Sequence, residues 1–132
     1  MSKMFRYGIV IPHYNSTQSL KRMLSSIPER DDLQIVIVDD CSKYEEIECL
    51  KKLSHQNLEV IYLNENHGAG YSRNEGFKQI NSEWVTFVDS DDMFAENAFD
   101  ILDTYVKSNY DMLCYYVKAI NSQSRKELKN IL

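Results

Sequence analysis

Five short apolar runs alternate with segments of helical periodicity, and this alternation is the feature that most limits the fold. The runs are rich in Val, Ile and aromatic residues, as β-strands are, and the second contains an uninterrupted aliphatic stretch, 35–38. Between the first two runs, Leu20, Met23, Leu24 and Ile27 recur at the spacing of one helix face. The five runs are 7–11, 33–38, 58–63, 84–88 and 112–117. We therefore predict an α/β, Rossmann-like fold, with a mainly parallel sheet and helices on both faces.

Polar segments follow the first four runs, at the points where the predicted strands end. In open parallel sheets, ligands bind outside the carboxyl ends of the strands, so these segments should meet at one rim. The segments are 12–15, 39–42, 64–73 and 89–92. We predict that a ligand site is built from them.

Three carboxylates, Asp89, Asp91 and Asp92, lie within four residues directly after the fourth run. Their oxygens are the ligands that Mg²⁺ and Mn²⁺ prefer, and a cation among them would offset their mutual repulsion. An Asp-rich turn that caps the next helix would also explain the triplet, because Asp is favoured at turns and helix starts. Taken alone, the triplet favours the turn.

Two further segments could contact a nucleotide. Asp39 and Asp40 follow the second strand and could hydrogen-bond a base or ribose, with turn formation as the alternative. Gly68 and Gly70 lie in a loop leading into a predicted helix that carries Arg73, and a helix start favours an anionic group. The loop has neither G-x-G-x-x-G nor P-loop spacing, so turn geometry alone also explains its glycines.

The formal net charge of −5 limits the partners. A nucleic-acid-binding surface needs basic charge to displace the counterions of the phosphates, so we expect no nucleic-acid partner. A phosphorylated small molecule would need a divalent cation at this acidic rim.

The three cysteines form no CxxC pair, so they indicate neither a zinc site nor a disulfide framework. The apolar runs are too short to span a membrane. We therefore expect a cytoplasmic protein, with peripheral contact at the inner face of the membrane left open. Neither His13 nor His67 has a nucleophile placed beside it by the sequence, so neither receives a catalytic role.

Together, the four polar segments resemble glycosyltransferase family 2, a family of inverting enzymes with the GT-A fold. The matching residues are 11–15 (IPHYN), 38–42 (VDDCS), Asn66 and Gly68 with 73–76 (RNEG), and 89–92 (DSDD). They occur in the family's order over nearly the whole chain, and four linked motifs are far more specific than one. The resemblance favours the metal site over the acidic turn.

The resemblance implies that a nucleotide lies against all four segments. Tyr14 would lie near the base, and Asp39 and particularly Asp40 would lie against the base and ribose. Arg73 would reach the base or the phosphates. The nucleotide-binding residues implied in this way are Pro12, Tyr14, Asn15, Asp39, Asp40, Gly68, Arg73 and Asp89.

The resemblance also implies a cofactor and a reaction. Asp91, together with Asp89, would bind Mn²⁺ or Mg²⁺ held by the diphosphate of a nucleotide-diphosphate sugar, with a UDP-sugar favoured. The sugar would pass with inversion to a hydroxyl of a carbohydrate or glycolipid acceptor. Inversion requires a general base, which in the family belongs to the C-terminal half, so we expect it beyond Leu132.

Residues 1–120 are therefore expected to form the nucleotide-sugar-binding part of a GT-A domain, with the C-terminal acceptor half missing. The polar residues 121–132 would be a tail or the start of that half. Two other functions stay open: a donor-binding module without transferase activity, and a sugar-nucleotide nucleotidyltransferase. The latter shares the topology but usually carries a glycine-rich, basic loop after the first strand, which residues 12–15 do not supply.

Overall fold

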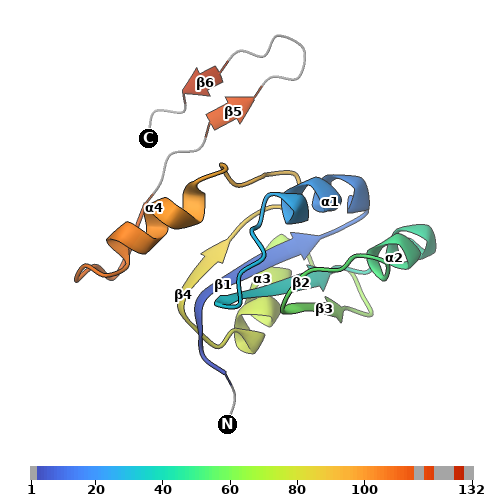
Figure 1. Cartoon of the computed structure of the whole chain (residues 1–132). Helices are drawn as coiled ribbons and strands as arrows, with labels where there is room; N and C mark the ends of the chain where they lie inside the picture. Colours follow the sequence, from blue (N-terminus) through green and yellow to red (C-terminus); the bar gives the residue numbers. More distant parts are fainter. Residues whose placement is uncertain (1–2, 115–117, 121–126, 130–132) are drawn as a thin grey trace. The chain divides into compact units, whose positions relative to one another are not determined.

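A four-stranded parallel sheet forms the centre of the computed structural model, which describes residues 3–114, 118–120 and 127–129 (Figure 1). The strand order is β3-β2-β1-β4, and each neighbouring pair is parallel. The strands are β1 (Phe5–His13), β2 (Leu33–Asp39), β3 (Leu58–Tyr62) and β4 (Ser82–Phe87). The predicted α/β class and parallel sheet are confirmed.

Three helices connect these strands and cover both faces of the sheet (Figure 1). They are α1 (Thr17–Ser25), α2 (Tyr44–Leu50) and α3 (Ala69–Gln79). Connections between parallel strands are right-handed, and the first two step in one direction along the sheet while the third returns past β1. Helices α1 and α2 therefore share one face and contact each other, whereas α3 packs against β1 and β2 from the other face.

The two central strands supply most of the core. Side chains of consecutive residues are fully buried, including Val10 and Ile11 in β1 and Val36 and Ile37 in β2. Since neighbouring strand residues point to opposite faces, both faces of these strands are covered, and each such side chain contributes about 1.5–3 kcal/mol on burial. Helix α3 can lie close to the sheet because Gly76 has no side chain, and a Cβ there would lie 2.5 Å from Val10 Cγ1.

The strand order places a topological switch point between β1 and β4. From β1 the chain moves outward to β2 and β3, and it then returns to add β4 on the opposite side of β1. The connections on the two sides of β1 therefore diverge and leave a crevice at the carboxyl ends, where α/β sheets bind ligands. The segments after β1, β2 and β4 all lead to this end of the sheet.

The chain divides into two compact units, Met1–Glu96 and Asn97–Leu132. The second unit contains α4 (Ala98–Tyr105) and an antiparallel pair formed by β5 (Lys118–Ile120) and β6 (Glu127–Lys129). The predicted strand 112–117 is wrong over residues 112–114, which form no strand, and residues 115–117 lie outside the described part. Apolar composition alone does not make a strand, because a strand is stable only when it pairs with another.

No helix in the described part of the chain is long and apolar enough to cross a membrane.

Candidate functional site

The loop that follows β1 is held by the buried imidazole of His13. Its Nδ1 lies 2.8 Å from Asp39 Oδ1, and its Nε2 accepts a hydrogen bond of 3.1 Å from the backbone N–H of Ser16. Because Nε2 accepts this bond, the ring proton lies on Nδ1 and is donated to Asp39, which makes His13 neutral. This histidine therefore aligns the start of α1 with the end of β2.

The carboxylate of Asp39 is fully buried and is used within the protein. In addition to His13, it accepts hydrogen bonds from Ser42 Oγ at 2.6 Å and from the Ser42 backbone N–H at 3.1 Å. Burial raises the pKa of this carboxyl, but the hydrogen bonds from His13 and Ser42 outweigh burial and hold the pKa below its ordinary value. Asp39 thus stays charged while it organises the loops after β1 and β2.

Asn15 links the same two loops. Its backbone N–H donates to Ser42 Oγ at 2.8 Å, and its side-chain Oδ1 accepts from the Lys43 N–H at 2.8 Å. Asn15 has a φ of 50°, in the left-handed region that Asn tolerates better than most residues. Asn15 therefore holds the loop after β1 against the loop after β2.

Asp40 secures the glycine loop that precedes α3. Its two carboxylate oxygens accept the backbone N–H groups of His67 and Gly68, each at 2.8 Å, and only 4% of the residue is exposed. Gly68 has a φ of 92°, a conformation that L side chains rarely adopt. The Gly68 N–H, expected to be a donor for an anionic ligand, is therefore already bonded to Asp40.

The loop after β4 brings three carboxylates together. Ligand oxygens of Asp89, Asp91 and Asp92 lie within 4.8 Å of one another, and all three residues are exposed. Partial burial, followed by the charges of Asp91 and Asp89, raises the pKa of Asp92. Three hard oxygen ligands at this separation, in a loop with an excess of negative charge, fit Mg²⁺ or Mn²⁺.

Helix α1 and the residues at its two ends hold this acidic loop at three points. Ser16 Oγ lies 2.8 Å from Ser90 Oγ, and the Arg22 guanidinium donates to the Asp91 carbonyl at 3.0 Å. Farther along, the Phe94 N–H donates to the hydroxyl of Ser26, the residue that follows α1, at 2.9 Å. The position of the carboxylates is therefore set by α1 as well as by β4.

Arg73 approaches the acidic loop from the first turns of α3. Its guanidinium donates to Asp89 Oδ1 at 2.8 Å, and both side chains are partly exposed, at 38% and 55%. Even with this guanidinium, the loop retains an excess of negative charge. A cation and a phosphorylated ligand could both be accommodated beside this pair.

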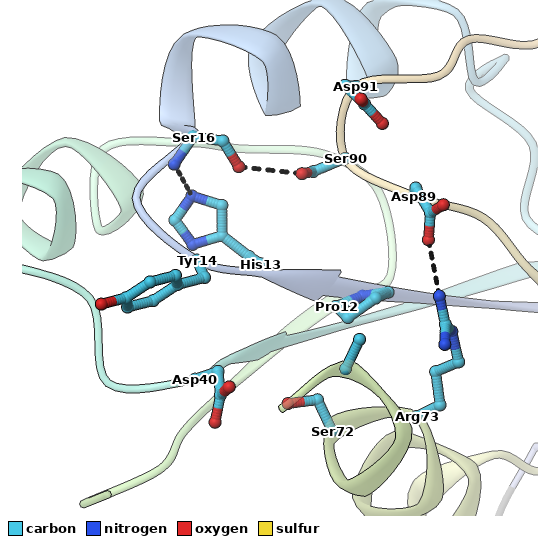
Figure 2. A pocket seen from close by; sticks show the side chains of 11 residues that line it. Pro12, His13, Tyr14, Ser16, Asp40, Ser72, Arg73, Asp89, Ser90 and Asp91 are labelled. Atoms are coloured by element: carbon cyan, nitrogen blue, oxygen red, sulfur yellow. Dashed lines mark hydrogen bonds and ion pairs between the residues drawn. The ribbon is translucent and has the colours of Figure 1, made fainter. Parts of the chain in front are cut away.

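These elements surround an open cavity of about 370 Å³ (Figure 2). Figure 2 shows Asp89 and Asp91 at one end and Asp40 at the other, with Pro12 between them. The lining residues are Pro12, His13, Tyr14, Ser16, Asp40, Ala69, Ser72, Arg73, Asp89, Ser90 and Asp91. A single cavity thus joins the segments after β1, β2 and β4 with the start of α3.

The cavity separates the predicted residues into two groups. Six of them line it: Pro12, Tyr14, Asp40, Arg73, Asp89 and Asp91. Asn15, Asp39 and Gly68 instead form hydrogen bonds behind the lining. The lining residues without a predicted ligand role are His13, Ser16, Ala69, Ser72 and Ser90. The only signal for them in the sequence was their adjacency to the motifs, because small residues and hydroxyls reveal a role only through their neighbours in space.

Comparison with known proteins gives consistent matches. The model of the family described as glycosyl transferase family 2 matches residues 8–132. Poly(ribitol-phosphate) beta-N-acetylglucosaminyltransferase TarS of Staphylococcus aureus is 30% identical over 127 residues, covering 91% of this chain and 22% of TarS. The chain therefore spans under a quarter of the length of that relative.

Solved structures agree on the fold. The crystal structure of S. aureus TarS residues 1–349 superposes with a TM-score of 0.70 and 30% identity, over 78% of this chain and 32% of that one. A mannosyltransferase from Pyrobaculum calidifontis, solved in complex with GDP-Man and Mn²⁺, gives a TM-score of 0.69 at 19% identity. The match covers 82% of this chain and 34% of the mannosyltransferase. At this low identity it supports the GT-A fold and nothing further.

Proposed function

Because the chain belongs to glycosyl transferase family 2, we propose that it forms the donor-binding part of an enzyme that transfers a sugar from a nucleoside-diphosphate sugar. The observation that carries this proposal is the single cavity lined by Asp40, Tyr14, Arg73 and the acidic loop. A UDP-sugar is the favoured donor. The acceptor is a hydroxyl of a carbohydrate or glycolipid, and the S. aureus relative is named for a poly(ribitol-phosphate) acceptor.

The donor would lie along the cavity with its diphosphate at one end and its nucleoside at the other. Its diphosphate belongs at the acidic end, where Asp91 and Asp89 would hold Mn²⁺ or Mg²⁺ and Arg73 would face the phosphate oxygens. When bound, such a cation neutralises the charge that develops on a departing diphosphate. The nucleoside belongs at the other end, because Asp40 can accept hydrogen bonds from a base or ribose and the exposed Tyr14 ring offers a stacking surface.

Hydrogen bonds within and behind the lining would preorganise this site. Asp39 and Asn15 tie the loops after β1 and β2, while Asp40 and Gly68 close the loop before α3. A site whose donors and acceptors are already in place loses less conformational entropy when a ligand binds. We propose that these residues support nucleotide binding through the backbone they hold.

The second candidate is a donor-binding module that transfers nothing. Among the described residues, the carboxylates that line the cavity are Asp40, Asp89 and Asp91. Asp40 is bonded to two backbone N–H groups, and the other two belong to the acidic loop. None of these three carboxylates is therefore available as the general base that deprotonates an acceptor hydroxyl. Donor binding without sugar transfer is consistent with this arrangement. We expect the base to be supplied from beyond Leu132.

We also propose a cytoplasmic setting, because the three cysteines are free and exposed and would stay reduced there. Contact with the inner face of the membrane would follow from a glycolipid acceptor.

Titration calorimetry with UDP tests the donor site. We expect the 132-residue chain to bind UDP with Mn²⁺ present, and binding to weaken by about tenfold or more when EDTA replaces the metal. Asp91→Ala should weaken binding and abolish the effect of Mn²⁺. Glu83→Ala, which removes an exposed carboxylate from β4, is the matched control and should bind like the wild type. Tight binding of UDP that ignores the metal would contradict the assignment.

Transfer is tested separately, by measuring release of UDP from a UDP-sugar in the presence of Mn²⁺. Binding without release supports the donor-binding module for this chain. Release at the rate of a longer family member would refute the placement of the base beyond Leu132.

A further inference from the structure

Ser72 has a buried hydroxyl that lacks a hydrogen-bond partner. The residue is 0% exposed, and Ser72 Oγ is the only buried side-chain nitrogen or oxygen without a partner among the residues that the structure describes. An unpaired buried hydroxyl costs about 1–3 kcal/mol, so buried polar groups are normally bonded. By contrast, the buried polar groups of Asp39, Asp40 and His13 all have hydrogen-bond partners.

The hydroxyl lies at the nucleoside end of the proposed donor site. Ser72 lines the cavity, and Figure 2 shows it near Asp40 and away from Asp91. Backbone hydrogen bonds connect the two residues: the Ser72 N–H donates to the Gly68 carbonyl at 3.1 Å, and the Gly68 N–H donates to Asp40 Oδ2 at 2.8 Å. The next residue, Arg73, turns toward Asp89 at the metal end.

We propose that Ser72 is a nucleotide-binding residue whose hydroxyl bonds the nucleoside part of the donor beside Asp40. This inference rests on the proposed function. An ionised Asp40 only accepts hydrogen bonds, whereas Ser72 can donate or accept. Together they match an edge with an N–H or O–H donor next to an acceptor, such as the hydrogen-bonding edge of a nucleobase.

A phosphate group does not match this pair. Phosphate oxygens accept hydrogen bonds and carry negative charge, so the Asp40 carboxylate would repel them. The exposed ring of Tyr14 lines the same cavity and can cover a flat base. Serine side chains occupy three staggered χ1 positions, so the Ser72 hydroxyl would reach the ligand by rotation about χ1.

A purely structural role for Ser72 makes a different prediction. Serine hydroxyls within helices can bond the carbonyl four residues earlier, which here belongs to Gly68. In that case the hydroxyl would influence the stability of α3, and its removal would leave nucleotide affinity unchanged.

Calorimetry on Ser72→Ala separates the two roles, using UDP and inorganic pyrophosphate as probes, each with Mn²⁺. We expect UDP to bind about 3- to 10-fold more weakly than to the wild type, which is the effect of losing one hydrogen bond. Pyrophosphate has no nucleoside, so its affinity should stay unchanged. The melting temperature without ligand should be unchanged or higher, because the variant has no unpaired hydroxyl to bury, and this rules out unfolding as the cause.

Ser25→Ala is the matched control. Its hydroxyl bonds the Arg22 carbonyl within α1 at 2.7 Å, away from the cavity lining, so both probes should bind normally. Unchanged UDP affinity in Ser72→Ala would overturn the inference, and so would an equal loss for pyrophosphate. Failure of the wild-type chain to bind UDP with Mn²⁺ would instead refute the proposed function and the inference with it.

Discussion

The Asp39 carboxylate and the His13 imidazole form a fully buried pair, with Oδ1 2.8 Å from Nδ1, that joins the ends of the two central strands. Because His13 also lines the cavity, this pair connects the stability of the fold with the shape of the site. Ser42 completes the arrangement by donating two hydrogen bonds to the same carboxylate.

Removing this carboxylate should destabilise the protein strongly. Asp39→Ala leaves the His13 Nδ1–H and the Ser42 donors without their acceptor, and each buried donor left unpaired costs about 1–3 kcal/mol. Urea unfolding at neutral pH measures the loss. Asp31→Ala removes an exposed carboxylate near the start of β2 and should cost less than about 1 kcal/mol. Similar losses in both variants would contradict the importance of the pair.

The same carboxylate should make stability depend on pH. Its pKa in the folded protein lies below the ordinary value of 3.8, so the folded state binds this proton less readily than the unfolded state. The contribution is therefore complete above 3.8 and is lost as the pH falls through the lower folded pKa. Thermal unfolding from about pH 6 down to about pH 2 should show this loss in the wild type and a smaller one in Asp39→Asn. A parallel decline in both would argue against it.

Asp40→Asn should loosen the loop before α3. An amide has one acceptor oxygen, so it can satisfy only one of the His67 and Gly68 N–H groups, and its NH₂ faces the other. We expect a loss of about 1–3 kcal/mol in stability and faster hydrogen exchange at both amides. Exchange at Ile37, in the middle of β2, is the internal control and should change only as much as global stability does. Unaltered exchange at both loop amides would contradict the role of Asp40.

Arg73→Ala should impair ligand binding far more than folding. The guanidinium pairs with Asp89 at a partly exposed position, where an ion pair contributes about 1 kcal/mol or less to stability. We expect UDP to bind about tenfold more weakly with Mn²⁺, because a charge-assisted contact to phosphate is lost. Lys78→Ala breaks the ion pair with Glu75 on the same helix and should leave binding intact. Equal UDP affinities in the two variants would argue against a phosphate contact.

Two glycines of α3 should respond to alanine in opposite directions. At Gly76 the added Cβ would lie 2.5 Å from Val10 Cγ1 and 3.1 Å from Val38 Cγ2, so we expect Gly76→Ala to cost about 1–3 kcal/mol. A Cβ added at Gly70 would have no packing neighbour within 4 Å. The better helix propensity of alanine should therefore raise the free energy of unfolding by up to about 1 kcal/mol. Chemical denaturation of the two variants checks this, and a stable Gly76→Ala would show that α3 does not pack as described.

The fold of the first unit could be predicted because its signals are local. Each of the strands β1 to β4 begins or ends within a few residues of an apolar run, and the unbroken aliphatic stretch in β2 indicated burial on both faces. Residues 112–114 of the fifth run form no strand, because strand formation depends on a partner and composition does not reveal whether one is present.

The site was predictable to the extent that the ends of parallel strands converge. This rule placed Asp40 and Asp91 at one cavity. It could not show that Asp39 points inward and Asp40 toward the loop before α3, because adjacent aspartates look alike in sequence. Nor could it identify Ser16 or Ser72, whose roles arise only when α1 and α3 are packed against the sheet.

The three contacts that α1 and the residues at its ends make with the acidic loop determine what must be transferred if this site is grafted onto another protein. Ser16, Arg22 and Ser26 are far from the carboxylates in sequence, yet they set the course of the backbone that carries them. An identical acidic loop transplanted onto another parallel sheet would leave these anchors behind, and only the proposed metal could then order it. The transferable unit is therefore the loop together with the first helix, and if the loop binds metal as proposed, a graft that includes both should bind it more tightly than the loop alone.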